Sequence, residues 1–297
     1  MIDVKFLIFL IIGFFWGGLT APVSIRLAGI YGILDIPDAR KIHKENMPRG
    51  GGLGLWFGYL LMSVIMSQEM PELRFISTGA TIIFICGYLD DMCSLSPFLR
   101  LGLHMIAASI VVIPLRLSPV VSVIAIIWLA GVTSAYNLID GMNGLCISIF
   151  IASSIALFVI GRSYSGIFMG AMALGILCWN FPAAQTFLGD GGSTLLGYLF
   201  ASHFITIALP ALRSVRFHEL ILLFVLFGGL PVIDTLTAFT RRMLTGKSPF
   251  YPDKKHLHHI LISLTGSTVM TVTILLMLQI MALAIGMRMY FRLTNVL

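Results

Sequence analysis

The chain has 297 residues, of which 58% are hydrophobic and only 11% are charged, and its mean hydropathy is +0.98. Soluble domains carry roughly 25% charged residues, so this composition excludes a water-soluble globule, and it equally excludes a disordered chain. We therefore predict an all-α polytopic membrane protein that forms a single integral-membrane domain over residues 1–297. The formal charge of +6 is explained by the bias of basic residues toward cytoplasmic loops, with no need for a nucleic-acid partner.

Apolar segments follow one another along almost the whole chain, and a membrane-spanning helix takes about 20 such residues. We predict about ten spans, at 6–28, 52–68, 75–89, 101–117, 120–136, 145–161, 166–180, 193–209, 218–240 and 267–287. They are expected to be helices, because the period-two alternation of a membrane barrel is absent. The first span has no convincing cleavage site after it, so we expect it to be retained.

The charged residues orient these spans. Basic residues are concentrated in the loops after the first and the ninth span, which include Arg40, Lys41, Lys44, Arg49, Arg241, Arg242, Lys254 and Lys255. Both are odd-numbered loops, so both are predicted to be cytoplasmic and both termini to face outward. Nine of the 13 acidic residues also lie in or beside the odd loops, which the bias of basic residues does not require. We infer that these loops form a functional site on the cytoplasmic face.

Carboxylates and glycine turns dominate three of the loops. Asp90 and Asp91 end an apolar span, where two adjacent carboxylates favour a divalent cation such as Mg²⁺ or a shared proton, although solvated charges at a helix end are an alternative. Asn137, Asp140 and Asn143 lie in the turn Asn137-Leu-Ile-Asp-Gly-Met-Asn-Gly, which suits hydrogen bonding to a base or a sugar, or simply a polar helix connection.

The next odd loop runs from Asn180 to the segment Gly189-Asp190-Gly-Gly-Ser193, which opens a span. Backbone N–H groups at a helix start favour a phosphate, and Asp190 favours its metal. No lysine follows at the spacing of a P-loop. Phe187 is a candidate to stack on a base, although a single phenylalanine more often packs in a core.

The first and last odd loops carry basic and imidazole groups. Arg241 and Arg242 suit phosphate, and His256, His258 and His259 suit a metal, a phosphate or proton transfer. Zinc is disfavoured because the loops offer hard oxygen ligands and lack partner cysteines. The first loop joins a basic segment, with Lys41 and His43, to Gly50-Gly-Gly, which indicates either a phosphate site or a topology anchor. Taken together, the loops predict phosphoryl chemistry between a soluble anionic substrate and a lipid.

These motifs resemble, in order and over nearly the whole length, those of the polyprenyl-phosphate N-acetylhexosamine-1-phosphate transferases (glycosyltransferase family 4). Relatives initiate O-antigen lipopolysaccharide, common-antigen or teichoic-acid linkage units in cell-wall biogenesis, and the lipid I synthase is more distant. The resemblance implies attack by undecaprenyl phosphate on the β-phosphorus of a UDP-amino sugar, by default UDP-GlcNAc, with release of UMP at the cytoplasmic face of the inner (plasma) membrane. It implies Mg²⁺, for which Mn²⁺ is an expected substitute, and in some members a homodimer.

The resemblance also assigns roles to residues. Asp90 and Asp91 match the catalytic pair, with Asp91 and Asp190 at the metal. The nucleotide contacts fall on Asn137, Asp140, Asn143, Asn180 and Phe187. The sugar and diphosphate contacts fall on Arg241, Arg242, His256, His258 and His259, with Lys41 and His43 as weaker matches for the lipid phosphate.

Three positions depart from the family pattern. Asn143 stands where many members carry aspartate, and Arg100 and His104 stand where lysine and glutamine are common. A cation-coupled transporter is the alternative, but it predicts acidic residues near the middle of the spans. A CDP-alcohol phosphotransferase would need an Asp-Gly-x-x-Ala-Arg segment, which the chain lacks. UDP-GalNAc, UDP-FucNAc and UDP-QuiNAc remain open as donors, and the polymer pathway is not specified.

Overall fold

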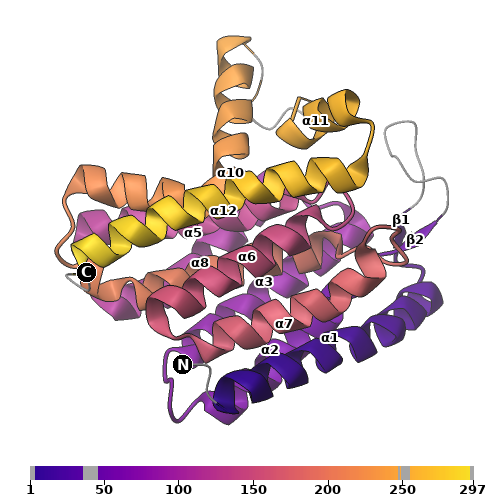
Figure 1. Ribbon diagram of the computed structural model, residues 1–297, viewed down its shortest axis with the longest axis horizontal. Helices are drawn as coiled ribbons and strands as arrows, with labels where there is room; N and C mark the ends of the chain where they lie inside the picture. The colour runs from indigo at the N-terminus through magenta and orange to yellow at the C-terminus, as the bar shows by residue number, and fades with distance from the viewer. Residues whose placement is uncertain (1–3, 36–45, 247, 249–254, 295–297) are drawn as a thin grey trace.

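The computed structural model describes residues 4–35, 46–246, 248 and 255–294, and most of them are helical (Figure 1). The helices are α1 (Val4–Tyr31), α2 (Gly51–Met66), α3 (Leu73–Cys93), α4 (Pro97–Val112), α5 (Pro119–Ile139), α6 (Leu145–Gly161), α7 (Tyr164–Asn180), α8 (Gly189–Ile207), α9 (Leu209–Leu212), α10 (Phe217–Leu244), α11 (Leu257–Thr265) and α12 (Thr268–Leu293). A short 3₁₀ turn, Ile113–Leu115, extends α4. The strands β1 (Leu34–Asp35) and β2 (Met47–Pro48) pair antiparallel, with Leu34 opposite Pro48.

Each predicted apolar range falls on one long helix, although the edges shift by several residues. Six helices of the described chain are long and apolar enough to cross a membrane, namely α1, α3, α4 with its 3₁₀ extension, α5, α10 and α12. Helices α2, α6 and α7 are apolar but shorter. The protein is therefore an all-α, multi-pass membrane protein. The total of ten crossings and the outward placement of both termini stay predictions.

Serine caps explain where several helices begin. Ser96 precedes α4 and accepts a hydrogen bond from Leu99 N at 3.2 Å, and Ser163 precedes α7 and accepts one from Gly166 N at 3.1 Å. Such a side chain satisfies one of the free N–H groups of the first turn. These caps fix the short connections between spans, including the one that follows the Asp90–Asp91 pair.

Helix α8 lies at the centre of the bundle. Its side chains are buried without interruption from Gly191 to Ile205, and it packs against α2, α3, α5 and α6. Phe204 stacks on Phe227 of α10, with ring centroids 4.2 Å apart. Because the start of α8 carries Asp190, this packing fixes that carboxylate relative to the ends of α3 and α5.

Helix α10 is broken in its middle. Gly229 has φ 55° and ψ −141°, and Pro231 follows two residues later. Proline lacks an N–H group and interrupts a helix, so the half after Gly229 takes a new direction and stands away from the bundle (Figure 1). The predicted span 218–240 falls on α10, and the break inside it is a feature that the apolar pattern does not reveal.

The two ends of the bundle carry different parts of the chain. Helix α1 begins and α12 ends on the left of Figure 1, whereas β1, β2 and α11 lie on the right. The right-hand end gathers the loops that carry the predicted site residues. The first and last described helical residues therefore lie at the opposite end from the site.

Candidate active site at the loop end of the bundle

The paired carboxylates at the end of α3 are each held by an arginine. Asp91 Oδ1 accepts from Arg49 Nη1 at 2.9 Å, and Asp90 is bound by the guanidinium of Arg100. Backbone groups complete the pair, because Leu95 N donates to Asp90 Oδ1 at 2.6 Å and Gly191 N to Asp91 Oδ2 at 3.3 Å. The repulsion predicted between these two aspartates is therefore relieved by two arginines, one before α2 and one in the first turn of α4.

Those two arginines also join the carboxylates to other elements. Arg49 binds Asp35 of β1 as well as Asp91, so it ties the small sheet to the end of α3. Arg100 Nη1 lies 3.5 Å from Asp190 Oδ2 as well as contacting Asp90. Neither arginine was singled out as a site residue from the sequence. Two features of the sequence are signals for them. Arg100, one helical turn into α4, stands where lysine is common in the family, and Arg49 directly precedes the glycine run Gly50-Gly-Gly.

The start of α8 approaches α3 very closely. Gly189 has φ +72°, and a Cβ on it would lie 2.5 Å from Asp91 Oδ2, so both its conformation and its position require glycine. Asp190 follows it, and its side chain contacts those of Asp90 and Asn137. The structure thus brings together Asp90, Asp91 and Asp190, as the predicted metal and catalytic roles require.

The end of α5 and the turn that follows it lie against the start of α8. Ser193 Oγ of α8 donates to Asn137 Oδ1 at 2.8 Å, which joins the end of α5 to the start of α8. Asp140 caps α5. Burial, followed by the negative charges of Asp190 and Asp91, raises the pKa of Asp140 well above its usual value. The shift favours the protonated, neutral form of Asp140 when no cation is bound beside it.

Two of the predicted nucleotide contacts link loops to each other. Asn180 Oδ1 accepts from Gly144 N at 2.7 Å, and its Nδ2 donates to Thr186 O at 2.8 Å. Asn143 Nδ2 donates to the carbonyl oxygen of Pro182 at 3.2 Å. Buried Asn180 thus connects the turn after α5 to the loop before α8, and its contact with a nucleotide stays a prediction.

Phe187 is positioned through its backbone. Its N–H donates to Pro48 O at 2.9 Å, and its carbonyl accepts from Gly51 N at 3.1 Å. It pairs with Arg49 in an isolated parallel bridge. Its side chain is only half-buried, so part of its surface is accessible.

The last odd loop is anchored to the broken helix by a hydrogen-bonded chain. His256 Nδ1 lies 2.7 Å from Asp234 Oδ2, and Arg242 Nη2 lies 3.3 Å from His256 Nε2. Since arginine only donates, we assign the His256 proton to Nδ1, which makes the ring neutral and its Nε2 the acceptor. Leu257 N adds a bond to Asp234 Oδ1 at 2.9 Å. Asp234 was not assigned a role from the sequence.

His258 reaches the turn after α5. A Cβ on Gly141 would lie 2.5 Å from His258 Nε2, so the missing side chain of Gly141 leaves room for the imidazole. His258 is 2% exposed, and its Nδ1 has no hydrogen-bond partner among the residues that the structure describes. Burial, and then the neighbouring His259 and His256, lowers the pKa of His258 to about 4. The ring is therefore neutral near pH 7. It lies tilted against the His259 ring, with ring centroids 4.2 Å apart, and stacks on the His256 ring at 5.9 Å.

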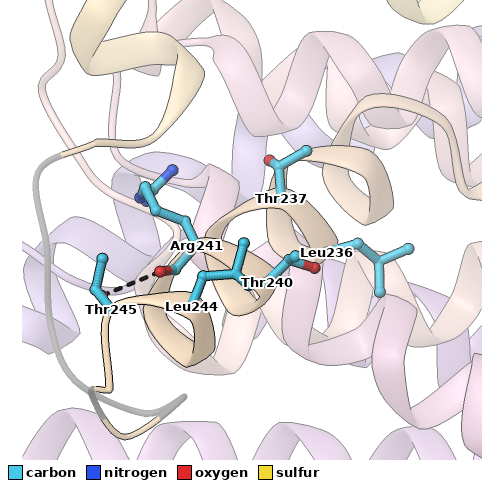
Figure 2. Close-up of a pocket in the computed structure, with 6 residues that line it drawn as sticks. All are labelled: Leu236, Thr237, Thr240, Arg241, Leu244 and Thr245. Carbon is cyan, nitrogen blue, oxygen red and sulfur yellow. Dashed lines mark hydrogen bonds between the residues drawn. The ribbon is translucent and has the colours of Figure 1, made fainter.

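Arg241 and Arg242 are adjacent in α10, but their side chains lie in different surroundings. Arg242 is buried against His256, whereas Arg241 lines an open pocket of about 580 Å³ on the outer half of α10, with Leu236, Thr237, Thr240, Leu244 and Thr245. Figure 2 shows the Arg241 side chain beside this pocket, with Thr245 bonded to the Arg241 carbonyl. Lys41 and His43 lie outside the described residues.

A metal fits this donor set only with help from a substrate. Among the residues that the structure describes, no group of three or more histidine, cysteine or acidic side chains has metal-binding spacing. Mg²⁺, however, is commonly held by one or two carboxylates together with substrate phosphates. Asp190 at the start of α8 and Asp91 near the end of α3 fit that pattern, because carboxylates are hard oxygen ligands that suit Mg²⁺.

Comparison with known proteins agrees with the ordered motifs. The sequence model of glycosyl transferase family 4 matches residues 73–208. The probable undecaprenyl-phosphate N-acetylglucosaminyl 1-phosphate transferase of Bacillus subtilis (strain 168) is 31% identical over 86% of this chain and 77% of its own length. The chain belongs to glycosyl transferase family 4. It is accordingly an enzyme, a phosphoglycosyl transferase, and the transporter alternative gains no support.

Other members of family 4 align over similar lengths. The undecaprenyl-phosphate alpha-N-acetylglucosaminyl 1-phosphate transferase of Thermotoga maritima is 32% identical over 84% of this chain and 78% of its own length. The Yersinia pestis protein of the same description is 27% identical over 80% and 72%. The family match at residues 73–208 contains the ends of α3 and α5 and the start of α8, where the carboxylates meet.

Proposed function

We propose that this protein transfers N-acetylglucosamine 1-phosphate from UDP-GlcNAc to undecaprenyl phosphate, forming the lipid diphosphate sugar and UMP. The observation that carries the proposal is the meeting of Asp90, Asp91 and Asp190 with two arginines at the end of a membrane bundle. The relatives named for this transfer support the choice of the amino sugar and the polyprenyl acceptor. We place the site on the cytoplasmic face of the inner membrane, from the basic residues of the odd loops.

The reaction exchanges one phosphate bond for another. An oxygen of the lipid phosphate attacks the β-phosphorus of the donor, and the bond from that phosphorus to the bridging oxygen breaks, so UMP leaves with that oxygen. The bond between the sugar and its phosphate is untouched, so the anomeric configuration is retained. A phosphate monoester is already largely ionised at neutral pH, since its second pKa is about 6. Asp90 and Asp91 therefore need to align the acceptor more than to deprotonate it.

The main difficulty is that both reactants are anions. Preorganised positive groups aimed at the developing charge give large rate enhancements. Mg²⁺, when bound at Asp190 and Asp91, supplies charge neutralisation for the diphosphate. Arg100 and Arg49 bind the carboxylates and orient them. We assign the nucleotide to Phe187, Asn137, Asp140 and the neighbouring asparagines, and the sugar and diphosphate to the last odd loop.

Release of UMP by purified protein in detergent tests the proposal. The assay supplies undecaprenyl phosphate and Mg²⁺ with UDP-GlcNAc, UDP-GalNAc, UDP-FucNAc or UDP-QuiNAc in turn, and omits the lipid or the metal as controls. We expect UMP from UDP-GlcNAc that depends on both. Release from another amino sugar alone would replace the donor and keep the reaction, whereas no release from any donor by folded protein would contradict the proposal.

A further inference from the structure

The break in α10 leaves backbone groups that need a partner. Gly229 departs from helical geometry with φ 55° and ψ −141°, so the N–H of Leu230 cannot continue the regular ladder. Within an apolar bundle, water is not available to satisfy such a group, and an unsatisfied N–H is costly there. A break of this kind persists only where neighbouring helices satisfy the freed groups.

Gln279 of α12 supplies that partner. Its Oε1 accepts from Leu230 N at 2.7 Å, and the residue is 0% exposed. A Cβ on Gly229 would lie 2.2 Å from the same Oε1. Glycine at position 229 thus provides both the positive φ and the space into which the glutamine amide fits.

The rest of the amide is held by two further helices. Gln279 Nε2 donates to Ser153 Oγ of α6 at 3.2 Å, and Ser153 Oγ donates to Ile149 O at 2.9 Å. Tyr136 OH of α5 lies 3.2 Å from Ser153 Oγ. Because the serine proton is used, the tyrosine is the donor in that pair. The amide is therefore oriented by α5 and α6, the helices that flank the turn 137–144.

The segment beyond the break carries the anchor of the last active-site loop. Asp234 binds His256 Nδ1 at 2.7 Å and Leu257 N at 2.9 Å, and the loop then places His258 against Gly141. The direction in which α10 leaves the break therefore decides whether the segment His256–His259 reaches the turn 137–144. A fully buried amide on α12 sets that direction from a distance.

We propose that Gln279 is a positioning residue for the transfer reaction, holding the break in α10 so that Asp234 and the segment His256–His259 stand beside the turn 137–144. This inference rests on the proposed function for its kinetic readout only. Gln279 touches neither substrate nor metal, and it acts through the backbone of α10.

The test measures the geometry of the break in α10 and the kinetics of the transfer reaction separately. Spin labels are attached at Phe217→Cys and Leu244→Cys, positions that are 64% and 83% exposed in the two halves of α10, after replacement of the exposed Cys93 and Cys178 by serine. Electron–electron resonance then measures the distance across the break. The kinetic readout is kcat and KM for UDP-GlcNAc per folded molecule in the unlabelled chain, with folded protein quantified by thermal unfolding in detergent.

Gln279→Met keeps the length of the side chain and removes the strong acceptor. We expect a broadened distance distribution and a fall in kcat/KM of about tenfold or more, since misplacing catalytic groups by an ångström costs up to about 100-fold. Gln279→Glu, which retains an acceptor and stays neutral when buried, is expected to restore both. Ser153→Ala removes the second bond but leaves the one to Leu230 N, and is expected to stay within about threefold of the parent.

Three results would overturn the proposal. One is Gln279→Met with an unchanged distance distribution and unchanged kinetics. The second is Gln279→Met with lost activity but an unchanged distance distribution. The third is Gln279→Met with a broadened distance distribution but full activity. If Gln279→Met does not fold, Gln279→Asn, with the same amide drawn back by one methylene, must give the same paired changes. A parent chain without UMP release would refute the proposed function, while the distance measurement would still decide the role of Gln279 at the break.

Discussion

At the scale of single residues, the site is a cluster of opposite charges that come from several elements. Asp90, Asp91 and Asp190 come from two helices, and they are met by Arg49, between β2 and α2, and by Arg100 of α4. Carboxylates so close together need positive charge to remain ionised. The structure supplies part of it from arginine, and a substrate-bound Mg²⁺ is the natural source of the rest.

Asp190→Asn is expected to lower kcat by about 100-fold or more, since it removes a charge partner of the metal and of the developing negative charge. Its unfolding temperature in detergent should stay near that of the parent, because the amide can keep the contact with Asn137. The control is Glu69→Gln, which neutralises an exposed carboxylate whose Oε2 lies 3.9 Å from Lys5 Nζ. Near-normal turnover of Asp190→Asn at low Mg²⁺ would remove this residue from the metal site.

Phe187→Leu is expected to raise KM for the UDP-sugar more than it lowers kcat, because the ring is assigned to the uracil and not to the reacting phosphates. Stacking of a base on an aromatic ring is worth roughly 1–3 kcal/mol, so KM should rise at least about fivefold. The measurement is initial rates over a range of donor concentrations. An unchanged KM would mean that Phe187 serves only in packing.

The three aspartates could be predicted from the sequence because each stands at a chemically unusual place, a paired carboxylate at a span end or a glycine turn opening a helix. Arg49 and Arg100 could not, since any loop arginine is also explained by topology. Their roles depend on which carboxylate each one meets. That is set by tertiary packing of α8 against α3, which short motifs do not reveal.

At the scale of elements, the last odd loop depends on the second half of α10. Asp234 takes both the His256 Nδ1 proton and the Leu257 N–H, while His256 Nε2 faces Arg242. The histidine therefore links a carboxylate to an arginine in one protonation state. Apolar patterning predicts α10 as a single span, because Gly229 and Pro231 interrupt the geometry without interrupting the hydrophobicity.

Asp234→Asn is expected to lower kcat/KM by about tenfold. The asparagine amide offers one acceptor oxygen, whereas two donors, His256 Nδ1–H and Leu257 N–H, meet the carboxylate of Asp234. If the His256 proton moved to Nε2 so that Nδ1 could accept from the amide, the new N–H would face the Arg242 guanidinium. Glu219→Gln, at the surface of the first half of α10, is the matched control, since Glu219 pairs with Arg216, three residues earlier in the chain. Equal kinetics for Asp234→Asn and the parent would show that this anchor does not affect the site.

At the scale of the whole molecule, alternation of the loops predicts that all odd loops share one end. The structure brings Arg49, Asp91, Asn180 and His258 into one connected cluster at that end, and it places Ser214 between α9 and α10 at the other. Counting spans was enough to predict this sorting. It was not enough to predict the short helices α9, which begins at the edge of the predicted span 193–209, and α11, which lies in the predicted loop between 218–240 and 267–287.

Thiol labelling tests the predicted orientation. In a Cys178→Ser background, the exposed Cys93 at the site end is expected to react with a membrane-impermeant maleimide only in inside-out vesicles. In a chain that also lacks Cys93, Ser214→Cys is expected to react only in right-side-out vesicles. Reaction of both thiols from the same side would contradict an odd number of crossings between them, and reaction of Cys93 from outside would place the site on the wrong face.

The central claim is that the sugar travels with its phosphate. UDP-GlcNAc labelled with ³²P at the β-phosphorus, incubated with the enzyme, undecaprenyl phosphate and Mg²⁺, and then extracted into organic solvent, tests it directly. We predict that the label enters the lipid fraction in step with unlabelled UMP in the aqueous phase. Label that remained in the aqueous phase as UDP while the sugar entered the lipid would show a simple glycosyl transfer, and would contradict the proposed reaction.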